Sequence, residues 1–215
     1  MSWLRNIFIV LSVFMSSAGH AAGELSNELA VKKLVEVLSA MKSMKADFRQ
    51  WVNDAKQASL QDVTGKVWIQ RPGNFRWDTN EPYPQQIVAS KGVIWIYDLD
   101  LDQITKKSLG NEVGNTPALL LSGDPQQLSE KFDISGYLFY ETNEYRFDLK
   151  PKGEDALFEL LRVHFKEGAL QDMYLQDSLG QTTRIAFKDA HRNVDIKPAV
   201  FDFKAPEGVD VITDM

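Results

Sequence analysis

The side chain with the clearest chemical demand in this sequence is Arg71, which stands among large apolar residues in the segment Trp68–Trp77. A guanidinium group keeps its proton in proteins near neutral pH, so burying it requires carbonyl or carboxylate acceptors from another part of the chain. The segment has the pattern of strand, turn and strand, with the turn at Pro72-Gly73. We therefore predict that Arg71 is a latch between two elements. The alternative is that it reaches the rim of an ordinary β-sandwich and pairs with a surface acid.

Few other side chains could carry out catalysis. The sequence has no cysteine, no G-x-S-x-G motif and no G-x-x-x-x-G-K-[ST] phosphate loop, so any ATP must be hydrolysed by a partner. We expect His164 in a strand and His191 in a polar turn, both at the surface. The run Asp98–Asp102 resembles the start of a calcium loop but lacks the glycine at the sixth place and the glutamate at the twelfth. We interpret it as a hairpin tip, and we expect no enzyme activity, cofactor or metal site.

Residues 1–22 have the pattern of a cleavable signal peptide. Arg5 supplies the positive charge, residues 7–15 form an apolar run, and residues 16–22 are mostly small. The pattern predicts export, with cleavage after Ala21 or Ala22 and one mature domain over residues 23–215. Because the sequence has no cysteine, we expect no lipid anchor on the mature N-terminus.

The charge balance narrows the possible partners. The chain carries 24 Lys and Arg against 30 Asp and Glu, a formal net charge of −6 at pH 7. A surface of this sign repels a phosphate backbone, which argues against nucleic acid as a partner. The hydrophobic content of 44% is sufficient for one packed core.

The spacing of apolar residues predicts the elements that hold these side chains. Val31, Leu34 and Leu38 lie on one helix face, which Met41 continues, and this stripe predicts an amphipathic helix over about residues 24–42. After the helix the period changes to two, which is typical of strands. The predicted strands lie within residues 46–51, 66–69, 75–77, 86–89, 93–97, 145–149, 161–165, 173–175 and 185–187.

Polar turns between these strands favour one large antiparallel meander over a parallel sheet. Two short helices are predicted between the strand groups. One is capped by Thr116, starts at Pro117 and ends before Gly123, and the other begins at Asp124 and Pro125. One long and two short helices cannot cover both faces of such a sheet, so we expect them together on one side. The predicted fold class is mainly β with an α lid.

Four motifs in order make the chain similar to a known family. They are Met-Lys-Ala-Asp-Phe-Arg-Gln at 44–50, the 65–77 stretch with Arg71-Pro72, Gly-Asn-Thr-Pro at 114–117, and Phe-Asp-Phe-Lys-Ala-Pro-Glu-Gly-Val at 201–209. With the signal pattern they resemble the LolA-type family of periplasmic carriers of outer-membrane lipoproteins, over residues 44–211. The resemblance implies an incomplete, half-open antiparallel β-barrel with an apolar cavity covered by one long and two short helices.

The resemblance also implies a cargo, partners and site residues. The cargo is the acylated N-terminus of lipoproteins, taken in the periplasm from an inner-membrane ATP-driven releasing complex and given to an outer-membrane receptor. Arg71 matches the arginine that holds the lid in the empty state by hydrogen bonds to lid backbone. The implied cavity and acyl-chain-binding residues, each of which could equally be plain core, are Leu34, Leu38, Met41, Trp68, Phe75, Trp77, Leu119, Leu120 and Leu121. We expect a monomer, as suits a shuttle between two membranes.

Two other functions remain open at this point. One is a periplasmic sensor that binds stray lipids or lipoproteins, although we would expect such a sensor to carry a second domain or a membrane anchor. The other is a general carrier of phospholipid or glycolipid, because an apolar pocket discriminates by only ~1–3 kcal/mol per misfit methylene.

Overall fold

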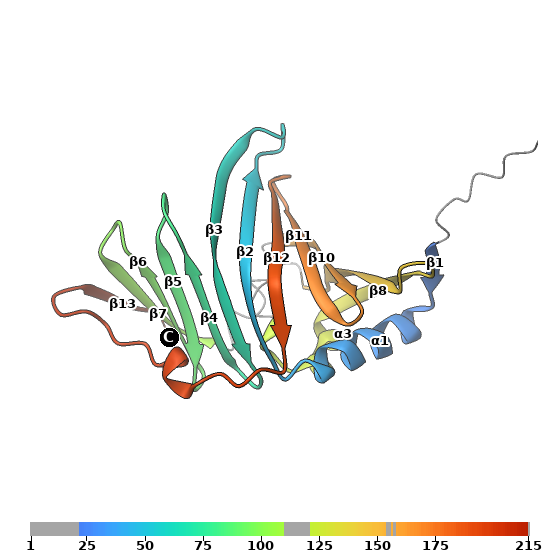
Figure 1. Cartoon of the computed structure of the whole chain (residues 1–215). Coiled ribbons are helices and arrows are strands. Elements are labelled where there is room, and N and C mark those ends of the chain that lie inside the picture. The colour runs from blue at the N-terminus through green and yellow to red at the C-terminus, as the bar shows by residue number, and fades with distance from the viewer. Residues whose placement is uncertain (1–21, 110–120, 154–155, 157, 215) are drawn as a thin grey trace, which may run out of the picture.

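A single curved sheet of 13 strands surrounds the core of this protein (Figure 1). The computed structural model describes residues 22–109, 121–153, 156 and 158–214. All but the last residue of the predicted signal peptide lies outside these ranges, as does most of the first predicted short helix, including Leu119 and Leu120. The strands are β1 (Ala22–Leu25), β2 (Ser43–Asn53), β3 (Ser59–Gln70), β4 (Asn74–Thr79), β5 (Gln85–Ser90), β6 (Val93–Asp98), β7 (Gln103–Ser108), β8 (Phe132–Phe139), β9 (Glu144–Pro151), β10 (Phe158–Lys166), β11 (Ala169–Asp177), β12 (Thr182–Arg192) and β13 (Asp210–Asp214).

The helices of the described residues are few. They are α1 (Asn27–Ala40), the 3₁₀ turn η2 (Pro125–Gln127), α3 (Leu128–Lys131) and the 3₁₀ turn η3 (Pro198–Phe201). None of them is long and apolar enough to cross a membrane. The second predicted short helix is present, with the Asp124 side chain accepting a hydrogen bond from the Gln126 amide at its start.

The long helix is shorter than predicted at both ends. It begins after Ser26, whose side chain accepts a hydrogen bond from the Leu29 amide, and not at Glu24. Residues 22–25 pair with β8 instead, with Glu24 opposite Tyr137. The stripe of apolar residues does not reveal this boundary, because the sheet partner of residues 22–25 lies more than 100 residues away in the sequence.

The sheet is mainly an antiparallel meander, as predicted, and it does not close. Its strand order is β1-β8-β9-β10-β11-β12-β2-β3-β4-β5-β6-β7-β13. Every predicted strand lies within an observed one, whereas β1, β7, β8 and β13 are not among those predicted. Charged and small residues in β7 and β8, such as Lys106, Lys107 and Gly136, weaken the alternation that marks a strand.

The last strand breaks the antiparallel pattern, which corrects the prediction. β13 runs parallel to β7, with Val211 opposite Ile104. Before it, the chain crosses the outer face of the sheet through η3, where the Val200 carbonyl accepts a hydrogen bond of 3.2 Å from Arg76 Nη1. Phe203 then stacks on Trp95, with ring centroids 5.3 Å apart. This crossing takes the chain from β12, in the middle of the sheet, to the edge formed by β7.

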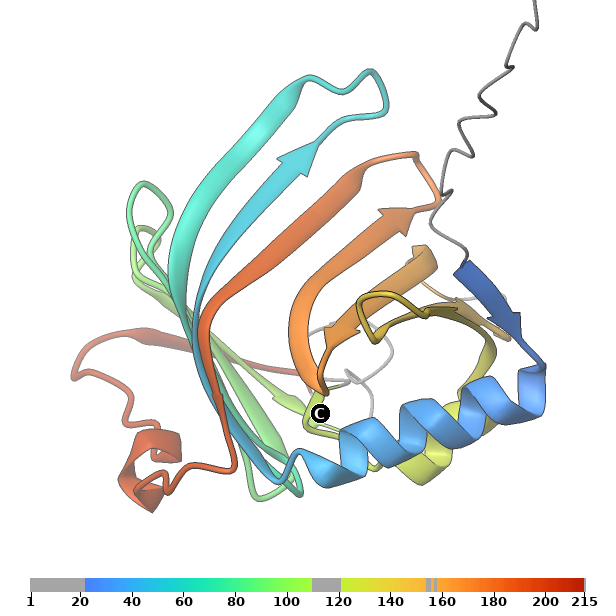
Figure 2. The same cartoon turned by 45° about the vertical axis from the view of Figure 1, so that its right-hand side comes forward.

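The main core lies on the concave side of the sheet, against α1. Leu34 and Leu38 are each 1% exposed and belong to one apolar cluster with Phe75 and Phe147 from β4 and β9. Figure 2 shows α1 lying across one end of the curved sheet, so that end is covered by a helix. The tips of the β2–β3 and β11–β12 hairpins extend at the other end (Figure 2).

Candidate functional site

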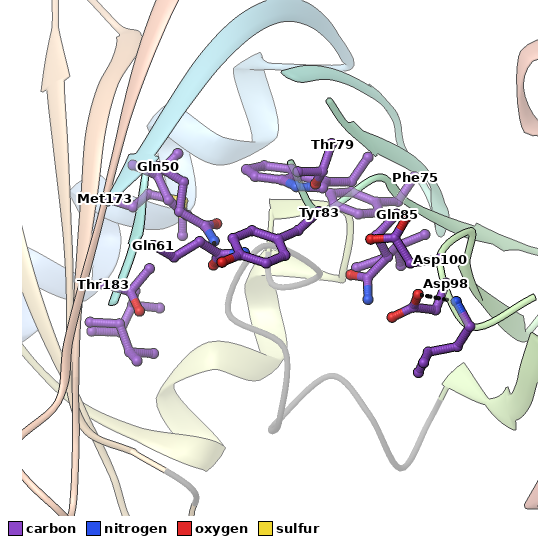
Figure 3. Close-up of a pocket in the computed structure, with 16 residues that line it drawn as sticks. Gln50, Gln61, Phe75, Thr79, Tyr83, Gln85, Asp98, Asp100, Met173 and Thr183 are labelled. Carbon is purple, nitrogen blue, oxygen red and sulfur yellow. Dashed lines mark hydrogen bonds between the residues drawn. The ribbon is translucent and has the colours of Figure 1, made fainter. Parts of the chain in front are cut away.

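The concave side of the sheet contains a cavity of about 650 Å³. This volume is within the range of ~300–1,000 Å³ that is common for ligand pockets. Figure 3 shows Gln50, Gln61, Met173 and Thr183 on one side, Gln85, Asp98 and Asp100 on the other, and Tyr83 between them. The lining residues are Gln50, Gln61, Phe75, Trp77, Thr79, Tyr83, Gln85, Ile87, Asp98, Asp100, Leu101, Leu161, Met173, Leu175, Thr183 and Ile185.

The register of β4 and β5 shows which lining residues lie near α1 and which lie at the opposite end of the sheet. The β3–β4 turn lies next to α1, because the Arg71 amide donates a hydrogen bond of 2.9 Å to the Lys42 carbonyl. From that turn outward, Phe75 pairs with Ala89, then Trp77 with Ile87. The last pair, Thr79 with Gln85, is polar. The cavity is therefore apolar in its depth and polar at its mouth.

Aromatic rings form the deep wall. Trp77 stacks on Phe48, with centroids 3.8 Å apart, and meets the edge of Phe187 at 6.4 Å. Trp77 is 5% exposed although it lines the cavity. Rings packed in this way stabilise one another beyond the area they bury, so the wall has a defined shape.

Arg71 joins three segments at the end of the sheet near α1. Its Nη1 donates a hydrogen bond to the carbonyl of Gly123. The amide of Gly73 donates a hydrogen bond of 3.0 Å to the carbonyl of Ser122. With the bond from the Arg71 amide to Lys42, these contacts join the β3–β4 turn to the end of α1 and to the segment before η2.

The guanidinium of Arg71 is mostly buried. Its Nε and Nη2 have no hydrogen-bond partner among the described residues. Burial lowers the pKa of Arg71 to about 10, and the attraction of the Asp124 carboxylate opposes this shift. The guanidinium remains charged at neutral pH, but its charge is less stable in this buried position than it would be in water.

The structure places the predicted site residues in different surroundings. Phe75 and Trp77 line the cavity. Four others are almost fully buried in the core cluster and are not among the lining residues: Leu34, Leu38, Met41 and Leu121. Leu119 and Leu120 lie outside the described residues.

Trp68 does not fit the predicted cavity role. It alternates with the buried Val67 and Ile69 of β3, so its side chain lies on the outer face of the sheet. There the guanidinium of Arg76 lies 6.0 Å from its ring centroid. The error comes from choosing a large aromatic by its type, whereas the parity of its position along the strand decides the face.

Several lining residues were missed by the sequence reasoning. Gln50 and Gln61 lie two positions along their strands from the buried Phe48 and Val63, so strand alternation could have placed them on the concave face. Tyr83 and Asp100 lie in hairpin tips, where no alternation exists. Only the curvature of the sheet brings those tips to the cavity.

The acidic tip and the histidines take no part in the cavity's depth. Residues 99–102 connect β6 to β7, which confirms the predicted hairpin tip. His164 is in β10, as predicted, on the outer face between Glu144 at 3.1 Å and Asp172 at 3.2 Å. His191 is exposed but lies within β12, so the prediction of a turn was wrong. A register shift between Lys188 and His191 explains the irregular sequence pattern there.

Comparison with known proteins identifies the family. The family model described as outer membrane lipoprotein carrier protein LolA matches residues 39–204. Outer-membrane lipoprotein carrier proteins of Azotobacter vinelandii and Pseudomonas paraeruginosa are similar, the first 39% identical over 88% of this chain and 90% of its own, the second 37% identical over 100% of both. An uncharacterised conserved protein of Thermus thermophilus shares the fold, with a TM-score of 0.55 and 10% identity over 88% of this chain and all of its own. The aromatic-walled cavity, the open sheet and these matches together show that the chain belongs to the LolA family of outer membrane lipoprotein carrier proteins.

Proposed function

We propose that this protein is a periplasmic, non-catalytic carrier that holds the acyl chains of lipoproteins in the cavity of its curved sheet. One observation supports this most directly: an aromatic-walled cavity of about 650 Å³, apolar in its depth, in a member of a family named for lipoprotein carriage. In this proposal the cargo comes from an inner-membrane ATP-driven releasing complex and passes to an outer-membrane receptor. The protein works as a monomer.

The physical chemistry of the cargo makes such a container necessary. Each methylene buried from water contributes about 0.8 kcal/mol, so a single long acyl chain resists entering water by roughly 12 kcal/mol. A lipoprotein therefore cannot cross an aqueous space with its acyl chains exposed. The lining residues Phe75, Trp77 and Leu161 provide apolar contacts of the kind that replace those lost from the membrane.

Release of the cargo requires a second interaction that favours the empty state, because a cavity that binds only by burying apolar area would retain its cargo. In the proposed mechanism Arg71 stabilises the empty, closed state through its bond to the Gly123 carbonyl, aided by the bond from Gly73 to Ser122. A hydrogen bond from a charged donor contributes about 1.5–3 kcal/mol. Because the guanidinium is mostly buried, closure also costs desolvation, which offsets part of this stabilisation.

The experiment is to incubate the purified protein with inner-membrane vesicles that carry newly made lipoproteins, and to weigh the released complexes by native mass spectrometry. The proposal predicts a one-to-one complex with acylated lipoprotein that forms only when the membrane fraction has ATP. Complexes with phospholipid alone would favour a general lipid carrier. Recovery of only the free protein would contradict carriage.

A further inference from the structure

The mouth of the cavity has a charge pattern that its depth does not explain. Two carboxylates line it, Asp98 at the end of β6 and Asp100 in the following tip. The Asp98 carboxylate accepts a hydrogen bond of 3.1 Å from the Leu101 amide, which holds it at the end of the turn. In the register of the sheet Asp98 stands beside Gln85, and Gln85 beside Thr79, so one polar row runs across three strands at the mouth.

The opposite side of the mouth is polar but uncharged. Gln50 and Gln61 are joined by a hydrogen bond of 3.3 Å between their side-chain amides, and Thr183 lies near them (Figure 3). An amide offers both donors and acceptors, which suits a peptide or ester group. This side therefore provides hydrogen bonds without selecting a charge.

Within the described part of the chain, the cavity lining itself brings no cation to these two carboxylates. None of the residues that line the cavity is Lys, Arg or His. Lys107 is the register partner of Ile94, which lies closer to α1 than Asp98 does, and it is not part of the lining. The internal positions outside the described ranges contain no Lys, Arg or His in the sequence.

From this pattern we propose that the mouth selects acyl chains whose polar end is peptide-like and uncharged or cationic, and rejects acyl chains that end in an anionic phosphate. The inference rests on the proposed function, since it assumes that acyl chains occupy the depth. A lipid phosphate placed among Asp98, Asp100 and Gln85 would meet two like charges and no cation among the lining residues. An acylated peptide would meet amides and, where it carries a lysine, two carboxylates.

The test measures binding of matched probes to the purified protein by isothermal titration calorimetry at low salt. The probes are palmitoyl-Gly-Ser-Ser-Lys amide, the same peptide with Glu in place of Lys, and palmitoyl lysophosphatidylglycerol. Since exposed charge pairs are weak, we expect the lysine peptide to bind at least about fivefold more tightly than either anionic probe, with a ratio that falls as salt increases.

Variants assign the selectivity to the mouth. Replacing both carboxylates, Asp98→Asn with Asp100→Asn, should bring the ratio close to one, because asparagine at 98 can still accept the turn hydrogen bond. Asp47→Asn with Asp133→Asn is the matched control, since it removes the same charge from exposed side chains on the outer face and should leave the ratio unchanged. Gln85→Lys is independent of the turn and should strengthen binding of the phosphate probe.

The outcomes separate the two proposals. If no palmitoyl probe binds, the cavity does not take acyl chains, and the proposed function fails together with the inference. If all probes bind equally, or the control changes the ratio as much as the mouth variant does, the inference is overturned and carriage stands. A loss of the ratio in the mouth variant alone supports the inference.

Discussion

Replacing Arg71 by leucine tests the proposed release step most directly. The substitution removes the charged donor that bonds to the Gly123 carbonyl, which contributes about 1.5–3 kcal/mol. It also removes the cost of burying the guanidinium. Burial lowers the pKa of Arg71 to about 10, which corresponds to roughly 3 kcal/mol of that cost, because one pKa unit is about 1.4 kcal/mol. The two contributions nearly cancel, so the free energy of unfolding should change by no more than about 2 kcal/mol in either direction.

Cargo transfer should change in one direction, toward retention, whereas the free energy of unfolding has no expected direction. In the proposed loaded state the leucine side chain would add an apolar contact with acyl chains, whereas the arginine would return to water. The variant also lacks the bond that draws the Ser122–Gly123 segment back. Because the lost bond and the removed desolvation cost nearly cancel in the closed state, the added apolar contact of about 1.5 kcal/mol is the main effect, and the equilibrium for hand-over should shift toward retention by about tenfold.

The assay loads the protein with a fluorescent palmitoylated peptide and follows its transfer to the purified outer-membrane receptor in liposomes, with urea unfolding measured in parallel. Arg49→Leu is the control, because Arg49 is an exposed arginine on the outer face, 2.7 Å from Asp62, and takes no part in the cavity. Arg71→Leu should load normally and hand over poorly. Transfer by Arg71→Leu at the rate of the control would refute the latch.

Three further outcomes are expected. Gly65→Ala should lower the free energy of unfolding by at least about 2 kcal/mol in urea titrations, because a Cβ at this position would lie 2.1 Å from the Asp78 carbonyl oxygen. Gly153→Ala is the control and should be neutral, because a Cβ there would have nothing within 4 Å. Trp77→Ala should cost about 3–5 kcal/mol by the same measurement and weaken binding of palmitoylated peptide in calorimetry; unchanged binding would exclude the deep wall as the acyl site. Between pH 10 and 12 the unfolded chain binds the Arg71 proton more strongly than the folded chain does, because burial lowers the pKa of Arg71 to about 10. The melting temperature of the wild type relative to that of Arg71→Leu should therefore rise with pH in this range. A constant difference between the two melting temperatures would show that the guanidinium is not desolvated.

Much of the fold could be predicted from the sequence because it depends on local patterns. Alternation and polar turns placed nine strands of the meander, and the cap at Asp124 marked the second short helix. The pairing of β1 with β8 and the parallel return of β13 could not be predicted, because each depends on contacts between distant segments. Short strands have too little internal pattern to reveal such partners.

The candidate site shows the same division. The sequence by itself determined that Arg71 needs an acceptor, because the chemistry of a guanidinium is the same in any fold. It also determined that Phe75 and Trp77 share a face, because their spacing is that of one strand. The tertiary structure alone decided that Leu34 and Leu38 of α1 pack in one core cluster with Phe75, while Gln50, Gln85 and Asp98 line one cavity. Curvature of the sheet brings these strands around one space, and curvature arises from the twist and pairing of all strands together, which no single segment encodes.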